Sequence, residues 1–335
     1  MVNIGVVGIG HWGPNHVRNF SQLSGSTVVA VADTSEERRK AILASYPEVT
    51  AYKTADELFA HDGLDAVVIA TPTATHYELV KAALGAGLDV LAEKPLAVTA
   101  VQCRELDELA KKNGRVLMVG HVFLFNSGIL KLKECSDDGS LGKVYYGHAT
   151  RVNLGPIRED VGAVFDLATH DISIFNYIFG GCPTTVSASG KCFLQKELED
   201  LAFLTLTYPS GQVANVHVSW LDPKKIRTIT LVGDRKMVTW DDLDPVGPIH
   251  IYDKSVIQEP YYESFGEFHL LAREGDITIP KVKMSEPLRA QSQHFIDCIS
   301  KRAESFSDGA FAAGVVAVLE ATQKSIEAGG APVEV

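Results

Sequence analysis

A glycine-rich segment near the N-terminus contains the first residues with chemical meaning, Gly8-Ile9-Gly10-His11-Trp12-Gly13. It follows an apolar run and precedes Pro14, a residue favoured in the first turn of a helix. Glycines between a strand and a helix let the backbone approach a pyrophosphate, which the N-terminus of the helix attracts. The alternative is a plain glycine turn, but this context favours a dinucleotide site.

An acidic residue follows at the spacing typical of such a site. Asp33 ends a second apolar run, about 20 residues after Gly13. A carboxylate there accepts a hydrogen bond from the ribose 2′-hydroxyl of NAD and repels the 2′-phosphate of NADP, so NAD is the expected cofactor. Arg38 and Arg39 either contact the adenine and weaken this preference or belong to a solvated helix face.

Two further loops follow apolar runs and are expected at the same edge of a parallel sheet, where ligands bind in such folds. They are Thr71-Pro72-Thr73-Ala74-Thr75-His76 and Glu93-Lys94-Pro95. A lysine at this edge can donate a hydrogen bond to a developing alkoxide. Lys94 is therefore a candidate for catalysis, although a lysine taken alone is more often a surface residue.

A second candidate group lies near the middle of the chain. Asp166 and His170 are four residues apart, so on a continuous helix they share one face. A histidine beside a carboxylate is the usual acceptor of an alcohol proton. The alternative is an aspartate that starts a helix and a histidine with a structural role.

The elements that position these residues alternate in type over the first 120 residues. Short apolar runs predict strands at 3–7, 27–32, 66–70, 89–92 and 116–119, with helices at 35–44, 76–85 and 100–112. Thr34 and Ser35 precede two glutamates and provide a cap signal for the first of these helices. Strands this apolar need helices on both faces, so the pattern predicts a doubly wound α/β Rossmann sheet.

After about residue 123 the pattern becomes α+β. Helices are predicted at 127–135, 169–179, 287–301 and 308–328, and strands at 143–152, 184–189, 202–208, 212–219, 226–232 and 236–240. Turn signals between neighbouring strands predict a mostly antiparallel sheet, and residues 241–284 are expected to form irregular strands and loops. We predict a Rossmann NAD-binding domain over 1–122 and a substrate-binding and oligomerisation domain over 123–335, with the last helices able to pack back on the first domain.

The composition limits the class of protein. With 46% hydrophobic and 22% charged residues, it is that of an ordinary globular protein. The net charge of −11 argues against nucleic acid or an anionic membrane as a partner. Neither a membrane span nor a signal peptide is recognisable, so a cytoplasmic location is expected. The five cysteines are scattered without CxxC spacing, which predicts neither disulfides nor a metal site.

Together these motifs resemble the Gfo/Idh/MocA oxidoreductases. The resemblance rests on the glycine-rich segment, the loop at 71–76, Glu93-Lys94-Pro95 and the Asp166/His170 spacing, and it covers essentially the whole chain. It implies a C-terminal domain with a large open sheet, and homo-oligomers, dimers or tetramers, formed through that sheet. It also implies that Lys94, Asp166 and His170 are the catalytic residues.

The sequence departs from the family's pattern at two positions. Ala168 stands where the family often has glycine, and Ser173 stands where it often has aspartate, while Asp171 is acidic here. These departures leave the contacts to the substrate open.

Within the family, segments 120–126 and 151–156 are similar to branches that act on nucleotide sugars, the UDP-N-acetylglucosamine 3-dehydrogenases among them. This similarity implies oxidation of a secondary hydroxyl, at C3, to a keto sugar. Arg151 and Arg158 are candidates to bind a diphosphate, although arginines in loops are as often solvated. The alternatives are an inositol or free-sugar dehydrogenase of the same fold, and a non-catalytic dinucleotide-dependent sensor.

The expected site residues form two sets besides the catalytic three. Cofactor contacts are expected from Gly8, Gly10, His11, Trp12, Gly13, Asp33, Thr34, Arg38, Thr71, Pro72, Thr73, His76, Glu93, Lys94 and His121. Substrate contacts are expected from Asn126, Arg151, Asn153, Arg158, Asp166 and His170.

Overall fold

A computed structural model describes residues 1–159, 161–260 and 268–335. The chain forms two compact units, one of residues 1–125 with 285–317 and one of residues 126–284 with 318–335. The helix α9 (Gly309–Glu327) contributes residues to both units. The functional domain boundary at 122/123 stays a prediction.

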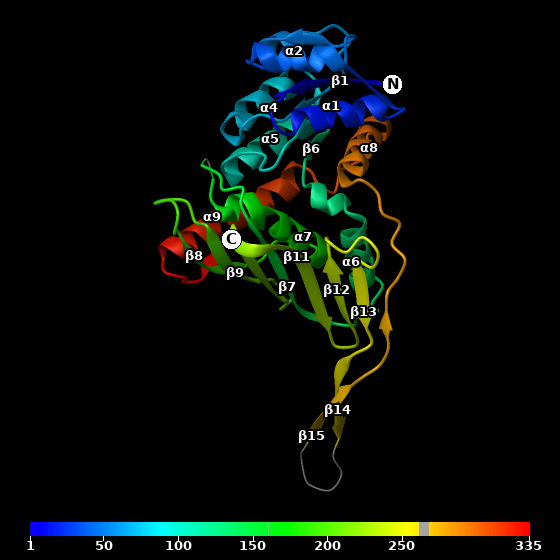
Figure 1. Cartoon of the computed structure of the whole chain (residues 1–335), viewed down its shortest axis with the longest axis vertical. Helices are drawn as coiled ribbons and strands as arrows, with labels where there is room; N and C mark the ends of the chain where they lie inside the picture. The colour runs from blue at the N-terminus through cyan, green and yellow to red at the C-terminus, as the bar shows by residue number, and fades with distance from the viewer. Residues whose placement is uncertain (160, 261–267) are drawn as a thin grey trace. The chain divides into compact units, whose positions relative to one another are not determined.

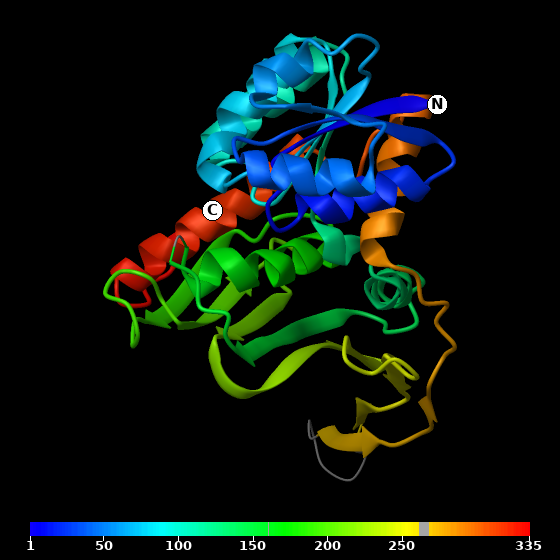
Figure 2. The same cartoon turned by 45° about the horizontal axis from the view of Figure 1, so that its top comes forward.

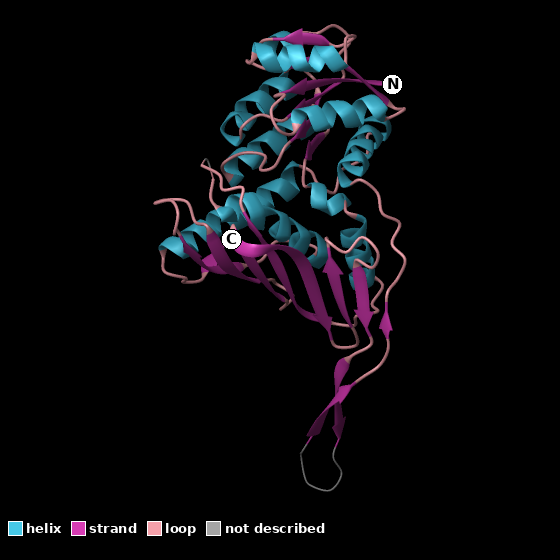
Figure 3. Ribbon diagram, viewed as in Figure 1, coloured by secondary structure: helices cyan, strands magenta, loops and turns pink. Residues whose placement is uncertain are grey.

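The first unit is built on a six-stranded parallel sheet with the order β3-β2-β1-β4-β5-β6. Its strands are β1 (Val2–Val7), β2 (Ser26–Ala32), β3 (Thr50–Tyr52), β4 (Ala66–Ile69), β5 (Asp89–Ala92) and β6 (Leu117–Val119). Figure 1 labels its strands β1 and β6, and Figure 3 distinguishes strands from helices by colour. The order reverses between β1 and β4, as in dinucleotide-binding sheets. The predicted doubly wound fold is therefore confirmed, and β5 has the predicted bounds.

The helices of this unit are α1 (Gly13–Gln22), α2 (Glu36–Ser45), α3 (Ala55–Phe59), α4 (His76–Gly85), α5 (Ala100–Lys112) and α8 (Pro287–Lys301), with short helical turns η1 (Thr73–Thr75) and η2 (Val122–Phe125). The predicted bounds of α4, α5 and α8 are confirmed. The side chain of Ser35 caps α2 by accepting a hydrogen bond from the amide of Arg38, as the cap signal predicts. The sequence does not reveal β3 and α3, because three and five residues are too few to form a hydrophobic period.

The core of this unit lies around the central strands. Every residue of β4 and β5 is buried, and α4 packs on both strands and on α5. Burial of each large aliphatic side chain here contributes about 1.5–3 kcal/mol to stability. The sheet is therefore a rigid platform for the loops at its carboxyl edge.

The second unit contains a nine-stranded sheet with the order β16-β13-β12-β11-β7-β10-β9-β8-β17. Its strands are β7 (Val144–Leu154), β8 (Thr185–Lys191), β9 (Leu201–Thr207), β10 (Val213–Ser219), β11 (Leu221–Gly233), β12 (Met237–Asp241), β13 (Ile249–Tyr252), β16 (Ile277–Thr278) and β17 (Val333–Glu334). All neighbours are antiparallel except β7 and β10, so the mostly antiparallel sheet is confirmed.

One face of this sheet is covered by α6 (Ser127–Asp137), α7 (Thr169–Phe179) and the C-terminal part of α9 (Figure 2). The other face is exposed: along β9, buried residues alternate with exposed Phe203, Thr205 and Thr207. The predicted bounds of α7 are confirmed.

The segment predicted as irregular strands and loops, 241–284, contains β13, β16 and a separate hairpin of β14 (Ser255–Pro260) and β15 (Phe268–Arg273). The part of that prediction over 261–267 lies outside the described residues. The hairpin strands pair with each other rather than with the large sheet.

Candidate active site

Five strand ends of the parallel sheet carry predicted cofactor residues. Gly8 follows β1, Asp33 follows β2, Thr71 follows β4, Glu93 follows β5 and His121 follows β6. Because the strands are parallel, these residues lie at one edge of the sheet, the edge at which ligands bind in open α/β folds.

The glycine-rich turn fits a pyrophosphate. Gly8 has a φ of +88°, a conformation that favours glycine, and a Cβ on Gly13 would collide with the carbonyl oxygen of Gly8. A Cβ on Gly10 would meet only the Nη1 atom of Arg38, at 3.6 Å, so there is space beside this residue. No described side chain caps the N-terminus of α1, which leaves that helix end able to attract an anion.

The Asp33 carboxylate organises this turn. It accepts hydrogen bonds from the amides of Ile9 and Ser35, each at 2.8 Å. The Arg38 guanidinium lies 3.6 Å from the same carboxylate and is 57% exposed. Arg38 is therefore mainly solvated but close to Asp33, the predicted ligand of the ribose, and Thr34 next to Asp33 is exposed.

His76 joins two loops of the site. Its ring is buried, with Nδ1 2.8 Å from the carbonyl oxygen of Pro95 and Nε2 2.8 Å from that of Thr71. Both ring nitrogens thus face carbonyl oxygens of the protein, and the role of His76 in cofactor binding stays a prediction.

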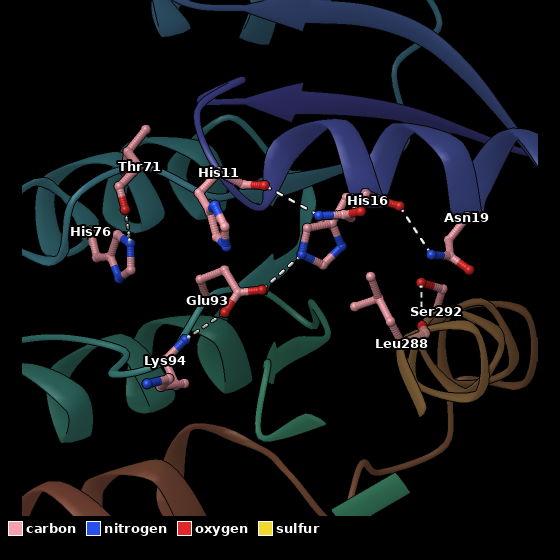
Figure 4. Close-up of polar contacts among 10 residues, drawn as sticks. His11, His16, Asn19, Thr71, His76, Glu93, Lys94, Leu288 and Ser292 are labelled. Atoms are coloured by element: carbon pink, nitrogen blue, oxygen red, sulfur yellow. Dashed lines mark hydrogen bonds and ion pairs between the residues drawn. The ribbon is translucent and has the colours of Figure 1, made fainter. Parts of the chain in front are cut away.

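Glu93 links α1 to the backbone of Lys94, as Figure 4 shows. Its Oε1 lies 2.8 Å from Nε2 of His16, a completely buried residue of α1, and its Oε2 accepts from the amide of Lys94 at 3.3 Å. His16 is not among the residues predicted from the sequence. The available signal was a histidine on the same helix face as Val17 and Phe20, which are also buried.

His121 is 1% exposed, and neither ring nitrogen has a hydrogen-bond partner in the described chain. Burial lowers the pKa of this histidine to about 3, with a further contribution from the positive charge of Lys94. The ring packs edge-on against Phe311 at 5.6 Å between centroids. The His121 ring is therefore neutral near pH 7 and lies close enough to Lys94, the candidate catalytic lysine, to be influenced by its charge.

In the second unit, Asp166 and His170 lie on two different helical elements. Asp166 is in η3 (Val164–Ala168), a single π-helical turn, and His170 is the second residue of α7. The two elements follow each other directly, so both residues lie on one unbroken helical run whose first part is a π-helical turn. Nη1 of Arg158 donates to Asp166 at 3.1 Å, so the predicted diphosphate ligand contacts a predicted catalytic carboxylate.

Comparisons with known proteins identify the family of this chain. Residues 2–121 match an oxidoreductase family with an NAD-binding Rossmann fold, and residues 129–239 match the GFO/IDH/MocA C-terminal domain. The chain belongs to the Gfo/Idh/MocA family of oxidoreductases. The predicted family and the predicted NAD-binding fold are thereby confirmed.

Individual relatives differ in how much of this Gfo/Idh/MocA protein they match. It is 30% identical to myo-inositol 2-dehydrogenase of Thermotoga maritima over 63% of this chain and 66% of that enzyme, so it spans about two thirds of that relative. It is 26% identical to UDP-N-acetylglucosamine 3-dehydrogenase of Acidithiobacillus ferrooxidans over 97% of each chain. A solved structure of the latter enzyme covers 97% of each chain with a TM-score of 0.80 and 25% identity.

Two of the predicted substrate residues of this Gfo/Idh/MocA protein are internal. Arg151 of β7 is 1% exposed, and its Nε and Nη2 donate to Asp171 at 2.7 and 2.9 Å. Removing one partner of such a buried pair costs about 3–5 kcal/mol. The predicted contact between Arg151 and a substrate diphosphate conflicts with this burial, and Asp171, which departs from the family's pattern, has a structural partner.

Asn126 is 5% exposed and caps α6, because its Oδ1 accepts from the amide of Gly128 at 2.8 Å while its Nδ2 donates to Asp242 at 3.1 Å. Its predicted substrate role conflicts with these contacts. Asn153 is half-buried, and its amide donates to the carbonyl oxygen of Gly155. Both asparagines therefore stabilise local backbone.

Within the described ranges, no group of histidine, cysteine and acidic side chains has the arrangement of a metal site. All five cysteines are free thiols. Among the described residues, no helix is both long and apolar enough to cross a membrane.

Proposed function

We propose that this protein is an NAD-dependent dehydrogenase that oxidises a secondary hydroxyl, at C3, of a nucleotide sugar such as UDP-N-acetylglucosamine. The observation that carries the proposal is the match to the Acidithiobacillus ferrooxidans enzyme over 97% of both chains. Function depends on the site rather than on the shared fold, so a match that includes the second unit bears on the substrate. The match to the Thermotoga maritima inositol dehydrogenase covers 63% of this chain.

In this proposal the glycine-rich turn and Asp33 hold the dinucleotide, and NAD, when bound, supplies the hydride acceptor. His170 accepts the hydroxyl proton, and Lys94 donates a hydrogen bond to the oxygen as negative charge develops on it. Asp166 orients the imidazole or a sugar hydroxyl. Arg158, whose side chain is 41% exposed, is the candidate ligand of the diphosphate and restrains Asp166 through their ion pair.

NADH formation with different substrates tests the proposal. We expect the purified protein to produce NADH with UDP-N-acetylglucosamine and NAD, and far less with myo-inositol or glucose. Turnover of inositol or glucose in preference to the nucleotide sugar would establish the second candidate, which the inositol dehydrogenase relatives favour. NAD binding without turnover of any of the three would support a non-catalytic sensor.

Substitution of the proposed catalytic residues tests their roles. We expect His170→Ala to lose about 10²–10⁴ in kcat, the usual contribution of general base catalysis, with the Kd for NAD unchanged. Lys94→Ala should also reduce kcat more than NAD affinity. His61→Ala is the control, because His61 lies close after α3 in the first unit and belongs to neither the predicted site nor the exposed sheet face. Near-normal turnover of His170→Ala would remove this residue from the proposed role.

We further propose that the exposed face of the nine-stranded sheet is the interface of a homo-oligomer, a dimer or a tetramer. Phe203 on this face is 48% exposed and stacks on His217 at 4.4 Å between ring centroids. Aromatic side chains are enriched at protein interfaces. A second copy of the same chain is the proposed partner.

A further inference from the structure

Glu199, just before β9, is an acid that the proposed chemistry does not use. It is 4% exposed although it is a carboxylic acid. Its Oε1 accepts a hydrogen bond from the amide of Val164 at 3.1 Å, and its carbonyl oxygen accepts from the amide of Ala163 at 2.8 Å. One residue thus binds two successive amides of the segment that enters η3.

The neighbouring backbone is shaped around this carboxylate. A Cβ on Gly162 would overlap with the carboxylate carbon and both carboxylate oxygens of Glu199, so glycine leaves the space that the acid fills. The carbonyl oxygen of Gly162 in turn accepts from the amide of Asp166 at 3.1 Å. Gly162 therefore links the two acids, because it lies against the Glu199 carboxylate and binds the amide of Asp166.

Backbone hydrogen bonds also connect Glu199 to the residue before His170. The amide of Val164 is bound by Glu199, and its carbonyl oxygen accepts from the amide of Thr169, the residue before His170. Both backbone polar groups of Val164, its N–H and its carbonyl, are thus hydrogen-bonded. A π-helical turn is rare and is found mostly at functional sites, where it sets side chains differently from an α-helix.

We infer that Glu199 is a positioning residue that fixes the start of the π-helical turn and so sets where Asp166 and His170 lie. The effect on catalysis rests on the proposed function, in which Asp166 and His170 act in the reaction. Burial disfavours the charged form of this carboxyl group and raises the pKa of Glu199 above its usual range. An uncharged amide of the same shape keeps an acceptor for Val164, so Glu199→Gln is the conservative variant.

The adjacent residue provides a matched control. Asp200 is completely buried, and its carboxylate accepts from the amides of Phe193 and Leu194. Asp200 follows Glu199 directly in the sequence but binds a different loop, at residues 193 and 194. Asp200→Ala, which removes the acceptor, should perturb the 193–194 loop and leave the 162–170 segment as it is.

The first readout is amide hydrogen exchange, which does not depend on activity. In Glu199→Ala we expect exchange in 162–170 to accelerate about tenfold, since a buried amide loses its acceptor. Glu199→Gln should return the rate to within about threefold of the wild type. Asp200→Ala should accelerate exchange around 193–194 but not in 162–170.

The second readout is turnover. Glu199→Ala should lower kcat about tenfold without changing the KM for NAD, and Glu199→Gln should recover most of it. Gly162→Ala should lower kcat to a similar extent, because the new methyl group displaces the carboxylate. The double variant Gly162→Ala/Glu199→Ala should be no worse than either single variant, since both remove the same contact.

The inference is overturned if Glu199→Ala leaves exchange in 162–170 unchanged, or if Asp200→Ala reduces kcat as much as Glu199→Ala does. Independent, additive losses from Gly162→Ala and Glu199→Ala would also contradict it. Wild-type protein that turns over none of the sugars would contradict the proposed function alone, while the exchange experiment would still decide whether Glu199 holds this segment.

Discussion

His121 illustrates at the residue scale how burial changes the chemistry of a side chain. Its pKa of about 3, against an ordinary value of 6.5, results first from burial and second from the charge of Lys94. Between these two pH values the unfolded chain binds a proton that the folded chain does not bind. The contribution of this histidine to stability is therefore present above pH 6.5 and is lost as the pH falls toward 3.

This difference predicts how the stability of a His121→Phe variant depends on pH. The free energy of unfolding of the wild type should fall between pH 7 and pH 5 by about 2 kcal/mol more than that of His121→Phe, which has no proton to bind at this position. Urea unfolding at the two pH values measures the difference. Equal pH dependences for wild type and His121→Phe would contradict the low pKa.

At the element scale, the turn between β1 and α1 separates two roles that glycine can have. A Cβ on Gly13 would collide with backbone, whereas a Cβ on Gly10 would meet only the end of a long arginine side chain. Gly13 is thus required by the packing of the turn. Gly10 faces the space that the pyrophosphate is expected to fill.

Alanine substitutions at these positions should therefore have different effects. Gly13→Ala should destabilise the protein by about 1–3 kcal/mol, the usual cost of overpacking, and should reduce NAD affinity as well. Gly10→Ala should leave the melting temperature almost unchanged but weaken NAD binding about tenfold or more. Thermal unfolding and calorimetric titration with NAD measure the two effects. Equal destabilisation by both variants would contradict this assignment.

At the scale of the whole molecule, a net charge of −11 coexists with a sheet face that exposes aromatic side chains. General repulsion keeps proteins of this charge apart unless a specific contact overcomes it. The proposed self-association through this face therefore depends on a few apolar contacts such as the Phe203 ring.

A charge placed on this face should dissociate the oligomer. We expect Phe203→Glu to weaken association more than tenfold, since a central aromatic residue commonly contributes about 2 kcal/mol or more to an interface. Val246→Glu is the control, because Val246 is 90% exposed in the loop between β12 and β13. Light scattering at several protein concentrations measures the mass. A wild-type monomer, or an equal effect of both substitutions, would contradict the proposed interface.

The sequence by itself determined the Rossmann fold, the NAD class and the residues at the sheet edge. These features depend on local signals. Apolar runs and cap residues predict strands and helix starts, and glycines at fixed spacing predict the turn between them. For this reason α4, α5, α7 and α8 have their predicted bounds, and the family could be named from motifs such as Glu93-Lys94-Pro95.

Only the tertiary structure decided which polar side chains are committed to the protein itself. Arg151 pairs with Asp171, Asn126 caps a helix, His76 joins two loops and Glu199 binds the turn before Asp166. The partners in three of these contacts come from distant parts of the chain or from different elements, so no local pattern identifies them. Whether a polar group is buried, and so must find a partner inside the protein, is a property of the packed molecule and not of the residue type.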